Sequence, residues 1–170
     1  MSDPVASKKS VALPRFPSTI AQRSQLIVQT EWSTELTWPQ VQTFARYVDA
    51  FRARKGEEVF HQGDRGHYLC LLVEGSVAIV KRDSSGQEKT LATVGPGKTF
   101  GEMSLIDGER RSATAIALED SRVVVLTEEN FKRLSYRHPR LGVALLLKMA
   151  RLMSQRLRNT SVMLVDFLDR

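Results

Sequence analysis

Short apolar runs separated by turn residues fill the sequence between residues 47 and 126 and restrict the fold more than any other feature. The runs expected to be strands are 59–60, 68–73, 76–80, 90–94, 112–118 and 122–126. Between them stand turn sequences such as Gly63-Asp64, Glu74-Gly75 and Gly95-Pro96-Gly97. Glycine supplies a positive φ and proline fixes φ, so these are turn chemistries. The pattern predicts an antiparallel sandwich or jelly roll.

Helices are expected on both sides of this region. Thr37 is a candidate helix cap, and Pro39 is tolerated in the first turn of the helix that follows. Thr127 is a candidate cap for a second short helix, after which Pro139 precedes a long helix over 140–168. The predicted fold class is therefore mainly β with α: an antiparallel jelly-roll β-roll flanked by a short N-terminal helix and a long C-terminal helix.

Three segments are expected. Residues 1–30 contain three prolines and no sustained apolar period, which indicates a flexible or weakly structured N-terminal tail. Residues 31–136 form the β-roll with its short flanking helices, and residues 137–170 form the long C-terminal helix.

The long helix carries an apolar stripe whose spacing alternates between four and three residues. Its members are Leu146, Ala150, Met153, Leu157, Thr160, Leu164 and Phe167. The stripe resembles a coiled-coil seam and is longer than a roll of this size can cover. We therefore expect a homodimer formed through the C-terminal helix.

Composition narrows the class of protein. No stretch approaches the roughly 18 apolar residues that span a bilayer, and the single cysteine allows no internal disulfide. A cytoplasmic protein without a membrane partner is expected. The net charge is +6, and residues 131–165 hold eight basic residues and no acidic one. These arginines interleave with leucines instead of aromatic residues, so we do not expect nucleic-acid binding.

Residues 100–114 carry the candidate chemistry. A glycine turn leads into one helical turn, a glycine-containing loop and an arginine at the start of a strand. The guanidinium of Arg111 matches two phosphate oxygens, whereas ionised Glu102 only accepts hydrogen bonds and suits a sugar hydroxyl. The pair predicts a ligand that contains both ribose and phosphate.

This stretch resembles the phosphate-binding cassette of the cyclic-nucleotide-binding domain family, of the catabolite activator protein and kinase regulatory subunit type. The matching positions are Phe100, Gly101, Glu102, Leu105, Arg111, Ser112 and Ala113. Turns at 61–64, 74–77 and 95–97 also fall where that family places them. The resemblance covers about residues 38–168.

The resemblance implies roles for individual residues. Glu102 would bind the ribose 2′-hydroxyl, and Arg111 would bind the cyclic phosphate and serve the ligand instead of the core. Gly101, Ser112 and Ala113 would offer backbone amides, and the Ser112 hydroxyl would add a phosphate or base contact. The expected site also includes Met103 and Ser104.

Base contacts are expected from the C-terminal helix, and two registers remain open. A gap-free alignment from Pro139 brings Arg156 and Leu157 to the base. A shift by one helical turn brings Thr160 and Ser161 there instead, and Thr160 is the one polar break in the apolar stripe.

The predicted function is a cyclic-nucleotide-binding regulatory or sensor module for cyclic AMP or, as the second choice, cyclic GMP. It would transmit ligand binding through its C-terminal helix to an unidentified protein partner. A DNA-binding-regulator fragment and a cyclic-dinucleotide receptor of the same family are the alternatives. The sequence ends at Arg170 without a helix-turn-helix, so it would act on another protein or belong to a longer polypeptide.

No catalytic residue, metal or cofactor is expected. His61, His67 and His138 lack the spacing of a metal-binding jelly-roll enzyme, and no P-loop or nucleophile motif is present. The protein is therefore predicted not to be an enzyme.

Overall fold

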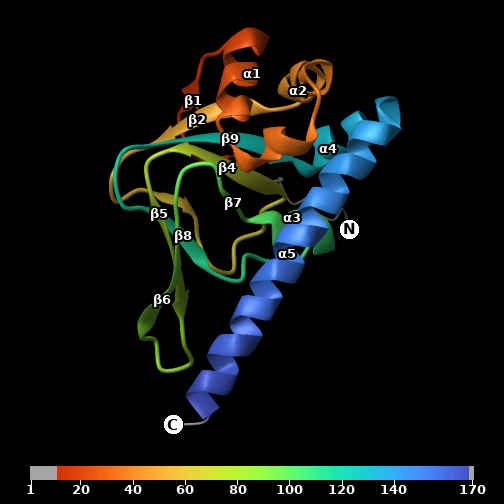
Figure 1. The fold of residues 1–170 in the computed structure, drawn as a ribbon. Coiled ribbons are helices and arrows are strands. Elements are labelled where there is room, and N and C mark those ends of the chain that lie inside the picture. Colours follow the sequence, from red (N-terminus) through yellow and green to blue (C-terminus); the bar gives the residue numbers. More distant parts are fainter. Residues whose placement is uncertain (1–10, 169–170) are drawn as a thin grey trace, which may run out of the picture.

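Two antiparallel β-sheets pack together in the computed structural model of the protein, which describes residues 11–168 (Figure 1). One sheet has the order β1 (Arg15–Phe16), β2 (Asp49–Ala53), β9 (Ser121–Thr127), β4 (Tyr68–Glu74) and β7 (Thr99–Phe100). The other has the order β3 (Glu58–Phe60), β8 (Thr114–Ala117), β5 (Val77–Arg82) and β6 (Glu88–Val94). The predicted mainly β roll is confirmed.

The central strands of the five-stranded sheet explain the most apolar runs of the sequence. In β4, Cys70 and Leu72 join the core between the two sheets, whereas Leu69 and Leu71 join a second core under the helices. A strand that is buried on both faces reads as a continuous apolar run. Burial also raises the pKa of the Cys70 thiol to about 12, so this thiol is neutral and unreactive at neutral pH.

A layer of helices covers the outer face of the five-stranded sheet. It consists of α1 (Ile20–Val28), the 3-10 helix η1 (Glu31–Glu35), α2 (Trp38–Ala45), α4 (Glu128–Arg137) and the first half of α5 (Pro139–Leu168). Glu35 of η1 pairs with Lys148 and Arg151 of α5 at 3.3 and 2.6 Å. The hydrogen bond from Lys148 holds the pKa of the Glu35 carboxyl below its usual value.

The prediction of a flexible or weakly structured N-terminal tail over 1–30 is wrong for residues 15–28. Residues 1–10 of that tail lie outside the described residues. β1 pairs with β2, and α1 begins with a capping box between Thr19 and Gln22. Leu26 and Ile27 of α1 are buried in the helical core. From the sequence, a short helix over residues 22–29 is only an open possibility, because the segment is short and buries only one narrow face.

The long helix α5 has two halves with different surroundings. Leu141, Leu145 and Met149 in the first half are buried, whereas every residue over 154–168 is exposed. Figure 1 shows this second half running past the short helix α3 (Glu102–Asp107) and beyond the roll. None of the helices described between residues 11 and 168 combines the length and apolar character that crossing a bilayer requires.

The first half of α5 approaches α4 closely at Gly142. A Cβ added at Gly142 would lie 2.6 Å from Ser135 Oγ and 2.8 Å from Ser135 Cα. Replacing a helical glycine with alanine normally stabilises a helix. Here we expect Gly142→Ala to lower the free energy of unfolding by about 1–3 kcal/mol, because α5 must move away from α4. Urea denaturation measures the change, and an increase in stability would contradict the close approach.

Candidate functional site

The short helix α3 is held between two glycines in the left-handed region. Gly101 precedes it with φ of 78°, and Gly108 follows it with φ of 72°. A Cβ at Gly101 would also lie 2.7 Å from Nη1 of Arg111. Glycine is therefore required at Gly101 both for the backbone conformation and for the approach of the arginine.

Glu102 begins α3 and is 2% exposed. Its Oε1 accepts a hydrogen bond from Nη1 of Arg156, which comes from the second half of α5. The other guanidinium nitrogen of Arg156 donates to the Thr99 carbonyl. Among the described residues, Glu102 Oε2 has no hydrogen-bond partner. A buried carboxylate oxygen without a donor is costly, so this atom is available for a hydroxyl from a ligand.

Arg111 is 3% exposed and lies against two aromatic rings. Its guanidinium carbon is 3.9 Å from the ring centre of Phe60 and 4.4 Å from that of Tyr68. Nη1 donates to the Gly101 carbonyl and Nη2 to the Tyr68 carbonyl, both at 2.8 Å. Within the described part of the chain, Nε has no partner. The cation is thus fixed in a poorly hydrated place, where its attraction for an anion is strong.

The expectation that Arg111 serves the ligand and not the core requires correction. The stacking on Phe60 and Tyr68 makes its side chain part of the packing between the sheets. Burial raises the pKa of the Tyr68 hydroxyl to about 12, so this ring is neutral, and its hydroxyl donates to the Val59 carbonyl at 3.0 Å. Loss of Arg111 therefore affects stability as well as ligand contacts.

A small cavity of about 100 Å³ brings most of the predicted site residues together. It is lined by Gly101, Glu102, Met103, Ser104, Arg111, Ser112, Ala113 and Arg156, together with Phe60, Ile79 and Phe100. Ligand pockets usually have volumes of about 300–1,000 Å³, so this one must open to admit a nucleotide. Arg111 also lines a cavity of about 400 Å³, but none of the cassette residues 101–104 does.

Thr160 and Ser161 lie outside this cavity. Both are exposed, and their hydroxyls donate to the backbone carbonyls of Arg156 and Leu157 at 2.9 Å. Of the gap-free register, Arg156 lines the cavity, whereas Leu157 is 68% exposed and does not line it. The aromatic rings around Arg111 were missed, since nothing in the sequence indicates that Phe60 and Tyr68 face the same guanidinium.

Comparisons with known proteins agree with this geometry. The family model described as "Cyclic nucleotide-binding domain" matches residues 50–138. The "Cyclic AMP receptor protein" of Thermus thermophilus is 41% identical over 108 residues, which cover 64% of this chain and 48% of that protein. The chain spans about half the length of the curated relatives it matches.

Solved structures give the same result. A cyclic nucleotide-binding domain from Methylobacillus flagellatus superposes with a TM-score of 0.74 at 27% identity, and the match covers 82% of this chain and 79% of that one. The catabolite activator protein of Thermus thermophilus superposes with a TM-score of 0.70 at 36% identity, covering 81% of this chain and 62% of that one.

Proposed function

We propose that this chain, which belongs to the cyclic nucleotide-binding domain family, is a receptor module that binds cyclic AMP and passes the signal on through α5. The observation that carries the proposal is that a buried carboxylate and a buried guanidinium line the same cavity. Among residues 11–168, one carboxylate oxygen of Glu102 has no partner, and the buried guanidinium of Arg111 lines the same cavity. Such a pair fits a ligand with a sugar hydroxyl next to a phosphate.

Each end of the ligand then has an assigned partner. The ribose 2′-hydroxyl donates to Glu102 Oε2, and the cyclic phosphate accepts from Arg111. Backbone amides of Gly101, Ser112 and Ala113 surround the phosphate. The exposed Ser112 hydroxyl adds a contact to the phosphate or base and keeps cyclic GMP as the second ligand.

Cyclic AMP is our first choice because two curated relatives have cyclic AMP in their names. The Thermus thermophilus protein is called a cyclic AMP receptor, and the Mycobacterium tuberculosis relative is called a cAMP-activated regulator. Calorimetric titration with cyclic AMP, cyclic GMP and a cyclic dinucleotide tests the assignment. We expect the tightest binding for cyclic AMP, and no heat with any of the three ligands would refute the proposed function.

Transmission depends on the second half of α5. Arg156 is the one side chain over 154–168 that hydrogen-bonds to the roll among the described residues. Its partner is Oε1 of Glu102, the carboxylate whose Oε2 we assign to the ribose, so a bound nucleotide would share Glu102 with Arg156. A ligand shifts a conformational equilibrium only through its different affinity for the two states. Contact with Arg156 gives the ligand such a difference.

We therefore expect binding to hold the second half of α5 at the roll and to order it over the base. Truncation after Met153 should weaken nucleotide binding but leave measurable affinity through Glu102 and Arg111. Hydrogen exchange of the full chain should slow over residues 150–168 when ligand is added. Changes confined to residues 100–114, with identical exchange along α5, would rule out this mechanism.

Two partners complete the proposal. The stripe on α5 leaves Leu157, Leu164 and Phe167 exposed, and a second copy of the chain would cover it. The signal would then pass to a partner protein that reads the state of this helix.

A second candidate function is the sensor part of a DNA-binding regulator. It is favoured by the curated relatives named as transcriptional regulators and by the eight basic residues over 131–165. Binding to duplex DNA of random sequence across a salt series tests it, since phosphate contacts weaken steeply with salt. We expect no binding at physiological salt, and salt-sensitive binding there would favour this second function instead.

A further inference from the structure

Strand β8 stops pairing with β5 just before it reaches the ligand segment. The antiparallel register runs from Val77↔Ala117 to Val80↔Thr114 and ends there. Continued by two residues, it would pair Arg82 with Ser112. β5 itself does continue, because Arg82 still pairs with Glu88 of β6. Ser112 and Ala113, which the sequence pattern places in the strand, form a bend instead.

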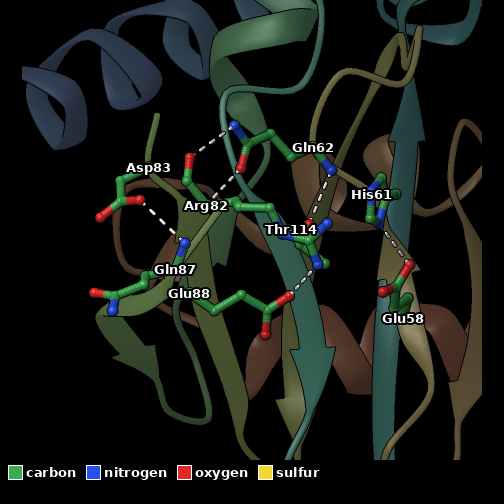
Figure 2. A network of polar contacts seen from close by, with 8 residues as sticks. All are labelled: Glu58, His61, Gln62, Arg82, Asp83, Gln87, Glu88 and Thr114. Carbon is green, nitrogen blue, oxygen red and sulfur yellow. Dashed lines mark hydrogen bonds and ion pairs between the residues drawn. The ribbon is translucent and has the colours of Figure 1, made fainter. Parts of the chain in front are cut away.

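The side chain of Gln62 takes the place that the Ser112 backbone leaves. Figure 2 shows its amide against the backbone of Arg82. Arg82 N–H donates to Gln62 Oε1 at 2.9 Å, and Gln62 Nε2 donates to the Arg82 carbonyl at 3.5 Å. A primary amide offers the same donor and acceptor as a peptide group. The side-chain amide of Gln62 therefore makes the hydrogen bonds to Arg82 that a backbone peptide group of a neighbouring strand would make.

The backbone around Gln62 fixes the other side of this junction. Gln62 N–H donates to Thr114 Oγ1 at 2.9 Å, at the first residue of β8. Gly63 N–H donates to the Arg111 carbonyl at 2.8 Å, and Arg111 N–H donates to the Asp64 carbonyl at 2.9 Å. The loop that carries Gln62 thus holds the backbone on both sides of Ser112.

Ser112 itself remains available. Ser112 is exposed, and its backbone N–H makes no hydrogen bond within residues 11–168. Had the β5–β8 ladder continued, the peptide groups of Arg82 would have occupied the Ser112 backbone. Because Gln62 satisfies Arg82, the Ser112 backbone amide stays free at the mouth of the cavity.

We infer that Gln62 is a positioning residue for ligand binding: it replaces Ser112 in the β5–β8 ladder and so keeps the Ser112 amide free for an anionic oxygen. The identity of that oxygen, a nucleotide phosphate, rests on the proposed function. The role of Gln62 in the ladder does not, because it follows from the contacts of the protein alone.

Gln62→Leu tests the inference in two independent ways. In the ligand-free protein, the ladder should extend to Ser112, and NMR hydrogen exchange should show the Ser112 amide exchanging more slowly than in the wild type. In calorimetric titration with cyclic AMP, Kd should rise about 3- to 10-fold, the equivalent of one hydrogen bond. Gln62→Glu keeps the acceptor for Arg82 N–H but loses the donor, so it should give a smaller change in the same direction.

Gln87→Leu is the matched control, at the turn between β5, which carries Arg82, and β6. Gln87 joins the network through its backbone N–H, which donates to Asp83 Oδ1 at 3.0 Å (Figure 2). It should leave both the Ser112 exchange rate and Kd unchanged. If Gln62→Leu does not fold, Gln62→Glu supplies both measurements.

The outcomes separate the two proposals. Equal Ser112 exchange in the Gln62 and Gln87 variants would overturn the inference, whatever ligand binds. A wild type that binds neither cyclic AMP nor cyclic GMP would refute the proposed function, while the exchange comparison in the ligand-free protein would still decide the role of Gln62. Slower Ser112 exchange with unchanged affinity would show that the ligand does not use this amide and would also overturn the inference.

Discussion

Replacing Arg111 with alanine is expected to weaken cyclic AMP binding by about 2–5 kcal/mol, because a desolvated anion loses its charged partner. This corresponds to a rise in Kd of roughly 30-fold or more. The buried guanidinium, already held by the carbonyls of Gly101 and Tyr68, is in place for the phosphate before the ligand arrives. Isothermal titration of the folded variant measures the loss, and unchanged affinity would refute the assignment.

Arg110→Ala is a suitable control for this experiment. Arg110 is the exposed neighbour, and its guanidinium donates to the Gly63 carbonyl at 2.8 Å. Its loss should leave affinity nearly unchanged. Arg111→Ala should also lower the free energy of unfolding, since Phe60 and Tyr68 lose the group that packs between them, so denaturation curves must accompany the titration. Arg111→Lys keeps the charge but not the planar fork, and should bind with intermediate affinity.

Leu157→Asp is expected to convert a dimer into a monomer. Leu157 lies in the middle of the apolar stripe on α5 and is 68% exposed in the single chain. In the proposed dimer its side chain would be buried against the second copy, where an unpaired carboxylate is strongly disfavoured. Light scattering at matched concentrations gives the mass directly.

The comparison variant is Asn159→Asp, which adds the same charge outside the stripe. It should remain dimeric. The dimer proposal fails if the wild type is already monomeric with cyclic AMP bound, or if both variants behave alike. Because α5 is exposed over 154–168, neither substitution should alter the fold of the roll.

The β-roll could be predicted because the residues within each strand and turn indicate burial and chain reversal by themselves. The apolar run of β4 and the glycine turns around it indicate burial and chain reversal without reference to distant residues. The caps are also local: Thr127 Oγ1 accepts from Asn130 N–H three residues later, and Thr37 N–H donates to Gln40 Oε1 at 2.9 Å. Strands β1 and β7, with two residues each, are too short to leave a pattern.

The candidate site could be predicted only as residue types. The sequence indicates that Glu102 and Arg111 share one cassette, but not that Arg156 bonds to Glu102 from 54 residues away. Such contacts depend on how α5 is placed, and α5 is placed by packing in the helical core. The replacement of the Ser112 backbone by the Gln62 side chain could not be predicted either. A β-strand pattern in the sequence does not show at which residue the strand stops pairing with its neighbour.

The helical layer brings together segments that are far apart in the sequence, so it forms late during synthesis on the ribosome. Leu26, Ile27 and Trp32 share one core cluster with Leu141, Leu145 and Met149, more than 100 positions later. A nascent chain can form local helices early, but this cluster cannot close until α5 has emerged. Contacts of such long sequence separation are formed late, because loop closure has to precede them. During translation the apolar face of α1 therefore stays open to chaperones until the first half of α5 has been made.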